Sequence, residues 1–371
     1  MHFNISLGVF LFIVLTSCKP TPPEVSEVGY EKLEEYETIV PYEENHLATP
    51  TILTYDEGTL YVYDYAIGHV LTFNSEGNLT EEIGRSGQGP GEFYLLNNIF
   101  VNDDALYFVD FGQVLIHKYD KNGNHITSID YGAMGYITSP MPPMNTGAVM
   151  ARDLTHQPHV TRQGDFLLSP FLAAELPEKM FDRINRDGEL ISRVGNVPEG
   201  STAEMEPNEH RAAISNDEIP PRDHANVFPV NDRANPDEYF LVYTAFPKIE
   251  KYNAAGEKLW SSDTVSVSEL DEVKKRYYDL MEQLTRSSWI PLNKYMSGVS
   301  SPDGELFLAT NTNPEIPGTL WLHRFDPDGK LTFRYELVSE DVNIPPIFDI
   351  DYDNQRIFVI TEEAEIRVYP F

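Results

Sequence analysis

The chain has 371 residues, 41% of them hydrophobic and 12% aromatic, which is the composition of a folded protein with a sizeable core. Its 59 acidic residues outnumber 27 lysines and arginines, giving a formal net charge of −32. So acidic a surface repels phosphate backbones and therefore excludes nucleic acids as partners. The charge serves either solubility or the attraction of cations and basic partners, and composition does not separate the two.

Cys18 is the only cysteine, which excludes disulfides, a zinc cluster and a catalytic thiol from the rest of the chain. It follows an apolar run, Ile5 to Leu15, that has the length of a signal-peptide core and is too short to span a bilayer. The sequence LTSC ending at Cys18 resembles the lipobox of bacterial lipoproteins, in which cleavage leaves an acylated cysteine at the N-terminus. We therefore expect residues 1–17 to be a lipoprotein signal peptide. The alternative is an ordinary signal peptide with an incidental cysteine, because no Lys or Arg precedes the apolar run.

Residues 18–32 are rich in Pro and Glu and are expected to form a flexible tether from the acylated cysteine. The protein would then be lipid-anchored to the outer or inner membrane of a bacterial cell envelope, on the extracytoplasmic side. The remainder, residues 33–371, is predicted to be a single domain.

One short pattern recurs through that domain: an aromatic or aliphatic residue, Asn or Asp, two variable residues and Gly. Asn or Asp caps a turn through its side chain, and Gly supplies the positive φ that closes a hairpin. The five copies are Phe73–Gly77, Tyr119–Gly123, Ile184–Gly188, Tyr252–Gly256 and Phe325–Gly329.

A dense β run precedes each copy, and a sixth run has no such hairpin after it. The six runs are Leu60–Tyr63, Leu106–Val109, Phe166–Leu168, Tyr239–Tyr243, Leu306–Leu308 and Ile357–Ile360. With the shorter apolar segments before them, they predict an all-β fold: a six-bladed β-propeller of four-stranded antiparallel blades. The last blade ends after three strands, so we expect Leu33 to Val40 to supply its fourth and close the ring.

One segment departs from the β pattern. Residues 268–286 carry apolar residues at helical spacing after Ser268, a suitable N-cap, with acidic residues in the first turn. We predict one inserted α-helix between blades four and five, resting its apolar stripe on one face of the ring. It serves either packing alone or as a lid or partner-docking helix.

The segment Gly84 to Phe93 reads GRSGQGPGEF and resembles the link between blades in NHL repeats. With its leader, the whole chain resembles the six-bladed TolB-like propeller lipoproteins of the Bacteroidetes type. The resemblance implies a fold and a habit of binding, without one chemistry. Strand follows these glycines, whereas a phosphate cradle requires a helix N-terminus, so we expect a structural link. Arg85 is its one candidate for contacting a ligand.

The densest polar cluster comprises Arg152, Asp153, His156 and His159, in an insertion spanning residues 134–159. Asp153, His156 and His159 are three apart, which on a helix would gather three ligands, but Pro158 argues against a helix. The cluster is therefore either a polar loop or part of a metal or acid–base site. No cofactor is predicted, with a divalent metal as the alternative. The insertion at residues 195–223 is acidic, Pro-rich and expected to be a mobile excursion.

Three functions remain open. The first is a non-catalytic, monomeric module that binds a carbohydrate or protein at the channel mouth. The second is an extracytoplasmic lyase or lactonase acting on sugar-derived substrates, with a His or metal site on the propeller axis. The third is a structural partner in an envelope assembly, docking through residues 268–286.

Overall fold

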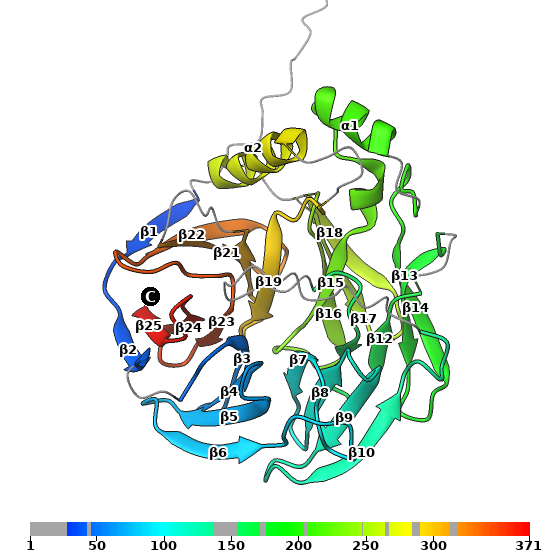
Figure 1. Ribbon diagram of the computed structural model, residues 1–371. Helices are drawn as coiled ribbons and strands as arrows, with labels where there is room; N and C mark the ends of the chain where they lie inside the picture. The colour runs from blue at the N-terminus through cyan, green and yellow to red at the C-terminus, as the bar shows by residue number, and fades with distance from the viewer. Residues whose placement is uncertain are drawn as a thin grey trace, which may run out of the picture.

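The computed structural model describes residues 28–42, 46–136, 154–170, 176–203, 207–246, 248–263, 267–283, 290–311 and 318–371. These residues form a ring of six antiparallel blades around a central axis (Figure 1). The predicted six-bladed propeller is therefore confirmed. The predicted signal peptide and Cys18 lie outside the described residues.

Each blade takes its strands from the chain in order, from the axis outward. Blades one to three contain β3 (Pro50–Asp56), β4 (Thr59–Asp64), β5 (His69–Asn74), β6 (Leu79–Ile83), β7 (Leu96–Val101), β8 (Leu106–Asp110), β9 (Leu115–Tyr119), β10 (His125–Asp130), β11 (His159–Val160), β12 (Phe166–Leu168), β13 (Lys179–Ile184) and β14 (Leu190–Asn196). Blades four to six contain β15 (Val227–Asn231), β16 (Glu238–Tyr243), β17 (Lys248–Asn253), β18 (Lys258–Asp263), β19 (Tyr295–Ser300), β20 (Leu306–Thr310), β21 (Thr319–Phe325), β22 (Leu331–Val338), β23 (Phe348–Asp351), β24 (Arg356–Ile360) and β25 (Ile366–Pro370).

The N-terminal segment closes the ring with two strands where one was predicted. Strand β2 (Glu37–Val40) pairs antiparallel with β25 and completes blade six, as expected. Strand β1 (Gly29–Leu33) pairs parallel with β22 and adds a fifth strand to blade five. Residues 29–32, assigned to the tether from composition, are thus held in a sheet. Pairing two blades with the same segment fixes the start of the domain to its end.

The repeated hairpin has the predicted geometry in all five copies. In the first, Asn74 Oδ1 accepts the backbone N–H groups of Glu76 (3.2 Å) and Asn78 (2.8 Å), and Gly77 has φ +85°. Asp120, Asn185, Asn253 and Asp326 accept the two corresponding N–H groups in the other copies. The Asx side chain therefore satisfies the turn's donors while Gly allows the reversal.

The glycine-rich segment links β6 to β7 and has a structural role. Phe93 at its end packs edge-on against Phe108, with ring centroids 5.3 Å apart, in the core between blades one and two. Gly84 has φ +66°, and a Cβ there would lie 2.4 Å from the Phe93 ring. A larger residue would therefore displace Phe93, which explains the glycine at this crossing.

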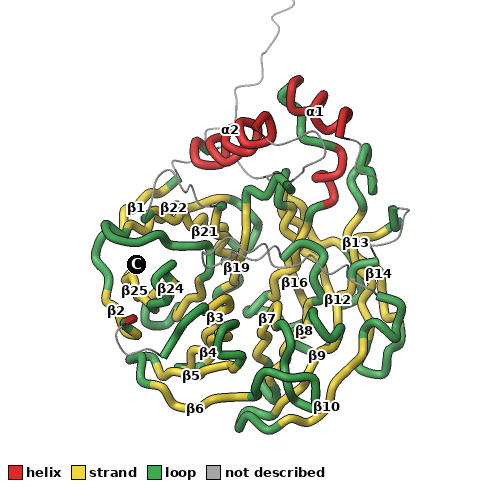
Figure 2. The backbone as a smooth tube through the Cα atoms, viewed as in Figure 1, coloured by secondary structure: helices red, strands yellow, loops and turns green. Residues whose placement is uncertain are grey.

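Two helices lie together at the edge of the ring (Figures 1 and 2). α2 (Ser268–Gln283) begins at the predicted residue, and residues 284–286 lie outside the described part of the chain. α1 (Pro207–Ser215) and a short 3-10 helix, η2 (Pro221–Ala225), were not predicted and lie in the acidic insertion. Neither helix among the described residues is long and apolar enough to cross a membrane.

The apolar stripe of α2 faces inward, as its spacing predicted. Leu270, Val273, Tyr277 and Met281 are buried, and Arg276 donates to the carbonyl of Asn311 (3.2 Å) in the loop after β20. α2 therefore packs against the loops of blades four and five.

Two buried polar networks anchor the same helix. At its N-terminus, Glu269 accepts from His323 Nε2 (2.9 Å) and from Arg334 Nη1 (3.2 Å) in blade five. Two turns later, the Tyr277 hydroxyl donates to Asp223 in η2 (3.1 Å) and bonds His210 Nε2 in α1 (2.6 Å).

Candidate functional site: the central channel

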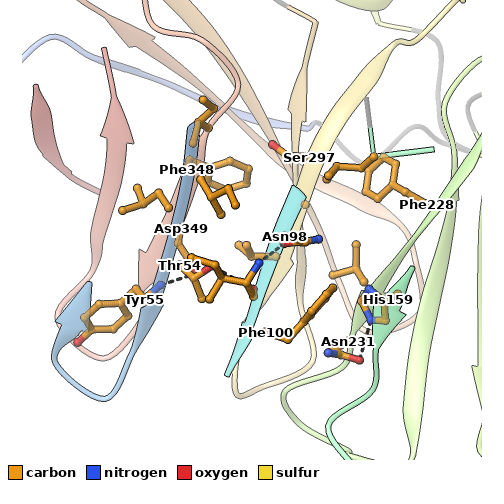
Figure 3. A pocket seen from close by; sticks show the side chains of 18 of the residues that line it. Thr54, Tyr55, Asn98, Phe100, His159, Phe228, Asn231, Ser297, Phe348 and Asp349 are labelled. Atoms are coloured by element: carbon orange, nitrogen blue, oxygen red, sulfur yellow. Dashed lines mark hydrogen bonds between the residues drawn. The ribbon is translucent and has the colours of Figure 1, made fainter. Parts of the chain in front are cut away.

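A cavity of about 170 Å³ lies on the axis of the ring (Figure 3). It is lined by residues from β3, β7, β11, β15, β19 and β23, the innermost strands of all six blades. Phe100, Phe228 and Phe348 supply aromatic surface, and Asn98 and Ser297 supply neutral polar groups. A concave site with apolar walls and a few convergent polar groups is the usual form of a small-molecule site.

The innermost strand of each blade has an open backbone edge, and contacts between neighbouring blades satisfy part of it. At five of the six junctions a side chain donates to a backbone carbonyl of the neighbouring blade, and at the sixth a carboxylate accepts a backbone N–H. In ring order these bonds are Thr54 Oγ1 to Ile99 O (3.3 Å), Asn102 Nδ2 to Thr161 O (3.1 Å), Asn231 Nδ2 to Val160 O (2.9 Å), Ser300 Oγ to Asn231 O (2.7 Å), Ser297 Oγ to Pro346 O (2.6 Å) and Tyr55 N to Asp349 Oδ2 (2.9 Å). The wall of the channel is thus held by hydrogen bonds at every blade junction.

Arg233 crosses the channel from blade four. Its Nη2 contacts both carboxylate oxygens of Asp349 in blade six (3.1 and 3.2 Å) and donates to the carbonyl of Tyr55 in blade one (3.2 Å). Asp349 is 3% exposed at its side chain, and burial raises its pKa although Arg233 opposes this. The side chain of Arg233 therefore forms a strut across the end of the channel reached by the carboxyl ends of the inner strands.

His159 lies in the channel wall with a defined tautomer. Because Asn231 Nδ2 donates to Val160 O, its Oδ1 must accept, and His159 Nε2 carries the donated proton (2.9 Å). The ring packs edge-on against Phe100 at a centroid distance of 4.6 Å. Burial lowers the pKa of His159 to about 4, so the imidazole is neutral at physiological pH.

The structure separates the predicted site residues. His159 lines the cavity, whereas His156 bonds Ser169 Oγ (3.2 Å) outside its wall, with its pKa lowered to about 3 by burial and the charge of Arg222. Arg85 is 70% exposed and pairs with Glu92 (2.6 Å), in the link between blades one and two. Arg152 and Asp153 lie outside the described residues.

No group of three or more His, Cys, Asp and Glu side chains that could hold a metal occurs in the part of the chain that the structure describes. Among the described residues, His156 bonds Ser169 and His159 bonds Asn231, and the structure shows no contact that joins the two imidazoles. The donors near the axis are instead amides, hydroxyls and guanidinium groups, which suit organic ligands better than cations.

Sequence reasoning missed Arg162, Asn231, Arg233 and Asp349, all in the channel lining. Arg162 and Arg233 each lie two residues beyond an inner strand, in the turn before a dense β run. Arg162 precedes its run by four residues and Arg233 by six, so aligning the turns on those runs does not bring the two arginines together.

The fold and the channel define the class, a six-bladed β-propeller. A family model described as 6-bladed beta-propeller, DUF5128, matches residues 38–134. A search of curated proteins finds no match. Among solved structures, the chain is similar to a presumed exported protein from Bacteroides fragilis, with a TM-score of 0.52 and 13% identity over 92% of this chain and 98% of that one.

Two further structures match with lower TM-scores. A member of the DUF4221 family from Bacteroides vulgatus gives a TM-score of 0.49 and 9% identity, covering 91% of this chain and 96% of that one. A catalytically inactive virginiamycin B lyase from Staphylococcus aureus, solved with quinupristin, gives 0.46 and 14%, covering 91% and 99%. Identities this low describe the fold alone.

Proposed function

We propose that this chain is an exported, lipid-anchored module that binds a small ligand in its central channel without transforming it. The observation that carries the proposal is the axial cavity of about 170 Å³, in which aromatic and neutral polar side chains from different blades converge. Such a lining can grip and orient a ligand. The lipid anchor rests on the LTSC sequence at Cys18, and export agrees with the description of the Bacteroides fragilis protein.

Thermal unfolding of the full chain with a panel of glycans, organic acids and divalent cations tests the binding. A ligand at 100 times its Kd stabilises the folded state by about 2.7 kcal/mol. Asn98→Trp should fill the cavity and abolish that stabilisation, while Asn98→Ala, which removes one polar group and leaves the cavity open, should retain part of it. Equal stabilisation of wild type and Asn98→Trp would place the binding outside the channel and refute the proposal.

The anchor has its own test. Cells that express the wild-type chain should carry a membrane-associated protein with an acylated N-terminal residue, detectable by mass spectrometry. Cys18→Ala should remove the acyl groups. A wild-type protein whose processed N-terminus carries no lipid would refute the anchor and leave channel binding unaffected.

A lyase or lactonase is the second candidate, favoured by the position of His159 in the channel wall. Its pKa of about 4 makes it a weak base at neutral pH, and it lacks a titratable partner within hydrogen-bond reach among the described residues. Turnover of a lactone or polyuronate that is lost in His159→Gln would support this candidate.

Docking of an envelope partner through α2 has less support. The apolar stripe predicted to form the docking surface is buried against blades four and five, and of its predicted apolar residues Leu280 is exposed, at 44%. One exposed leucine is ordinary for a protein surface.

A further inference from the structure

The end of the channel spanned by Arg233 carries a second arginine in an equivalent position. Arg162 lies two residues after β11 and Arg233 two residues after β15, in neighbouring blades. The two turns open in the same way, because Thr161 N donates to Asp165 O (2.9 Å) and Asp232 N donates to Glu238 O (3.1 Å). Both arginines line the axial cavity.

Each guanidinium group retains unused donors. Arg162 makes one hydrogen bond to a described residue, from Nη2 to Asp103 Oδ1 (3.0 Å), and Asp103 is almost fully exposed. Arg233 uses Nη2 for Asp349 and Tyr55. The Nε and Nη1 groups of both arginines therefore have no partner among the residues that the structure describes.

The acidic side chains of the lining are already engaged. Asp349 accepts from Arg233 and from the backbone N–H groups of Tyr55 (2.9 Å) and Ile350 (2.7 Å). Asp56 pairs with Lys121 Nζ (2.8 Å). The described lining thus offers spare cationic donors, whereas its carboxylates are occupied.

We propose that the channel binds a small organic acid whose carboxylate accepts hydrogen bonds from Arg162 and Arg233. The inference rests on the proposed function, since it names the class of ligand for the same cavity. Guanidinium forks match the geometry of a carboxylate, and their charge strengthens each bond. The aromatic rings of Phe100, Phe228 and Phe348 cover the remainder of the ligand. An engineered cavity of roughly 150 Å³ holds benzene, which sets the scale of the ligand.

The net charge of −32 bears on how the channel would prefer an acid to a neutral molecule. A surface so acidic repels anions at long range, so general electrostatic attraction cannot concentrate an acid here. Preference for an acid over its neutral counterpart must come from donors at short range. Arg162 is the stronger anchor, because its partner Asp103 is exposed and Arg233 already bridges two blades.

The test compares acids with matched neutral molecules on the full chain, by calorimetric titration and thermal unfolding. The pairs are acetate and acetamide, benzoate and benzamide, and D-glucuronate and D-glucose. At least one acid should bind while its neutral counterpart binds about 10- to 100-fold more weakly, the loss expected for a hydrogen bond to a charged group. Arg162→Gln should weaken that acid by a similar factor, and Arg162→Lys should lie between.

Arg193→Gln is the matched control, because Arg193 pairs with Asp182 (3.2 Å) on blade three and lies outside the cavity. It should leave acid binding unchanged. Circular dichroism and the melting temperature of each variant show that it is folded.

The outcomes distinguish this inference from the proposed function. Neutral members that bind as tightly as the acids, and are blocked by Asn98→Trp, would overturn the acid preference and retain a binding channel. Binding of an acid that is unaffected in Arg162→Gln would also overturn it. No binding by any acid of the panel refutes the inference outright, whereas the proposed function fails only if its wider panel also gives no stabilisation.

Discussion

Two buried carboxylates anchor α2, Glu269 at its N-terminus and Asp223 two turns later through Tyr277, and their pKa values are shifted in opposite directions. Burial alone would raise the pKa of Glu269, but the His323 hydrogen bond and the charge of Arg334 lower it to about 2. Burial raises the pKa of Asp223 to about 7, against bonds from the Leu292 backbone, Tyr277 and Asn226 and the charge of Arg222. Glu269 has a cation in direct contact, whereas the hydrogen-bond partners of Asp223 are neutral groups.

The comparison shows that the partner, more than the burial, decides whether an internal carboxylate is ionised. His323 is fully buried and its pKa is lowered by that burial, so it donates to Glu269 as a neutral ring while Tyr295 bonds its other nitrogen (2.8 Å). Arg334 then supplies the compensating charge. The Asp223 network contains His210, whose pKa burial lowers to about 4, so it contributes no positive charge near neutrality.

The largest effect should come from Glu269→Ala. The substitution leaves His323 and Arg334 without their acceptor, and breaking a buried ion pair costs about 3–5 kcal/mol. Urea unfolding at pH 7 measures the loss. Glu269→Gln is the matched control, because it keeps the shape and one acceptor and should lose less. A loss below about 1 kcal/mol for Glu269→Ala would show that Glu269 does not anchor the helix.

Because Glu269 is ionised in the folded protein, we expect the free energy of unfolding to fall at acid pH. Since its folded pKa lies below the unfolded value, the stabilisation is present above about pH 4.5 and is lost as the pH falls toward 2. Between pH 5 and 2, wild type should therefore lose stability relative to Glu269→Gln. Parallel pH profiles for these two proteins would contradict an ionised Glu269.

Asp223→Asn should reveal a pH dependence of the opposite sign, in which wild type loses stability as the pH rises. The folded pKa of Asp223 is raised, so its contribution is most favourable below about pH 4 and is lost as the pH rises through about 7. An asparagine can mimic the protonated acid toward Tyr277, so the variant should gain on wild type between pH 4 and 7, by about 2–4 kcal/mol at the plateau. Urea unfolding of both proteins across this range measures the difference.

His210 provides the control for that experiment, because it gives a pH dependence of the opposite sign. The pKa of His210 is lowered in the folded state, so its buried neutral ring costs stability as the pH falls below about 6.5. The double variant His210→Gln with Asp223→Asn should lose both slopes. A difference between wild type and Asp223→Asn that does not change with pH would show that Asp223 is ionised throughout.

Sequence predicted α2 because its apolar residues recur at helical spacing from Leu270 to Met281 after a capping Ser268. The hairpins could also be predicted from the sequence, since the Asx and Gly residues that form each turn lie within five residues of each other. Glu269 contacts His323 at a sequence separation of 54 residues, and nothing local to either residue reports that contact. α1 was missed for a related reason: its burial depends on α2, with Arg211 bonding the carbonyl of Met281 (3.0 Å).

In the channel, too, the local elements could be predicted from the sequence and the long-range contacts could not. Its six walls could be predicted from the dense β runs and the turns before them. Arg162 and Arg233 are ordinary turn residues in the sequence, and they differ from Asp103 and Pro302 in the corresponding turns only once the blades are superposed. His159 was predicted as a site residue because of its spacing from His156. In the structure, its place in the channel wall is instead fixed by its hydrogen bond to Asn231.

Tyr277→Phe should have an intermediate effect. It removes the hydroxyl that joins His210 to Asp223, and leaving buried polar groups without that partner costs about 1–3 kcal/mol. Tyr278→Phe is the matched control, since the Tyr278 hydroxyl is exposed and donates to Glu218 O (2.8 Å) at the surface. Equal losses for the two variants in urea unfolding would remove the distinction between buried network and surface contact.

The smallest effect should come from the ion pair that joins α2 to the end of α1. Lys274 Nζ lies 2.7 Å from Asp217 Oδ1, and the carboxylate is 81% exposed, so solvent screens the attraction. Lys274→Met should lose about 0.2–1 kcal/mol at low salt, and less at 1 M salt, where screening is stronger. Lys274 also donates to the carbonyl of Asp217 (3.0 Å), so Asp217→Asn, which keeps that bond, isolates the charge. If Lys274→Met matched the loss from Glu269→Ala, exposure would not govern the worth of a charge on this helix, and the contrast between its buried and exposed ion pairs would fail.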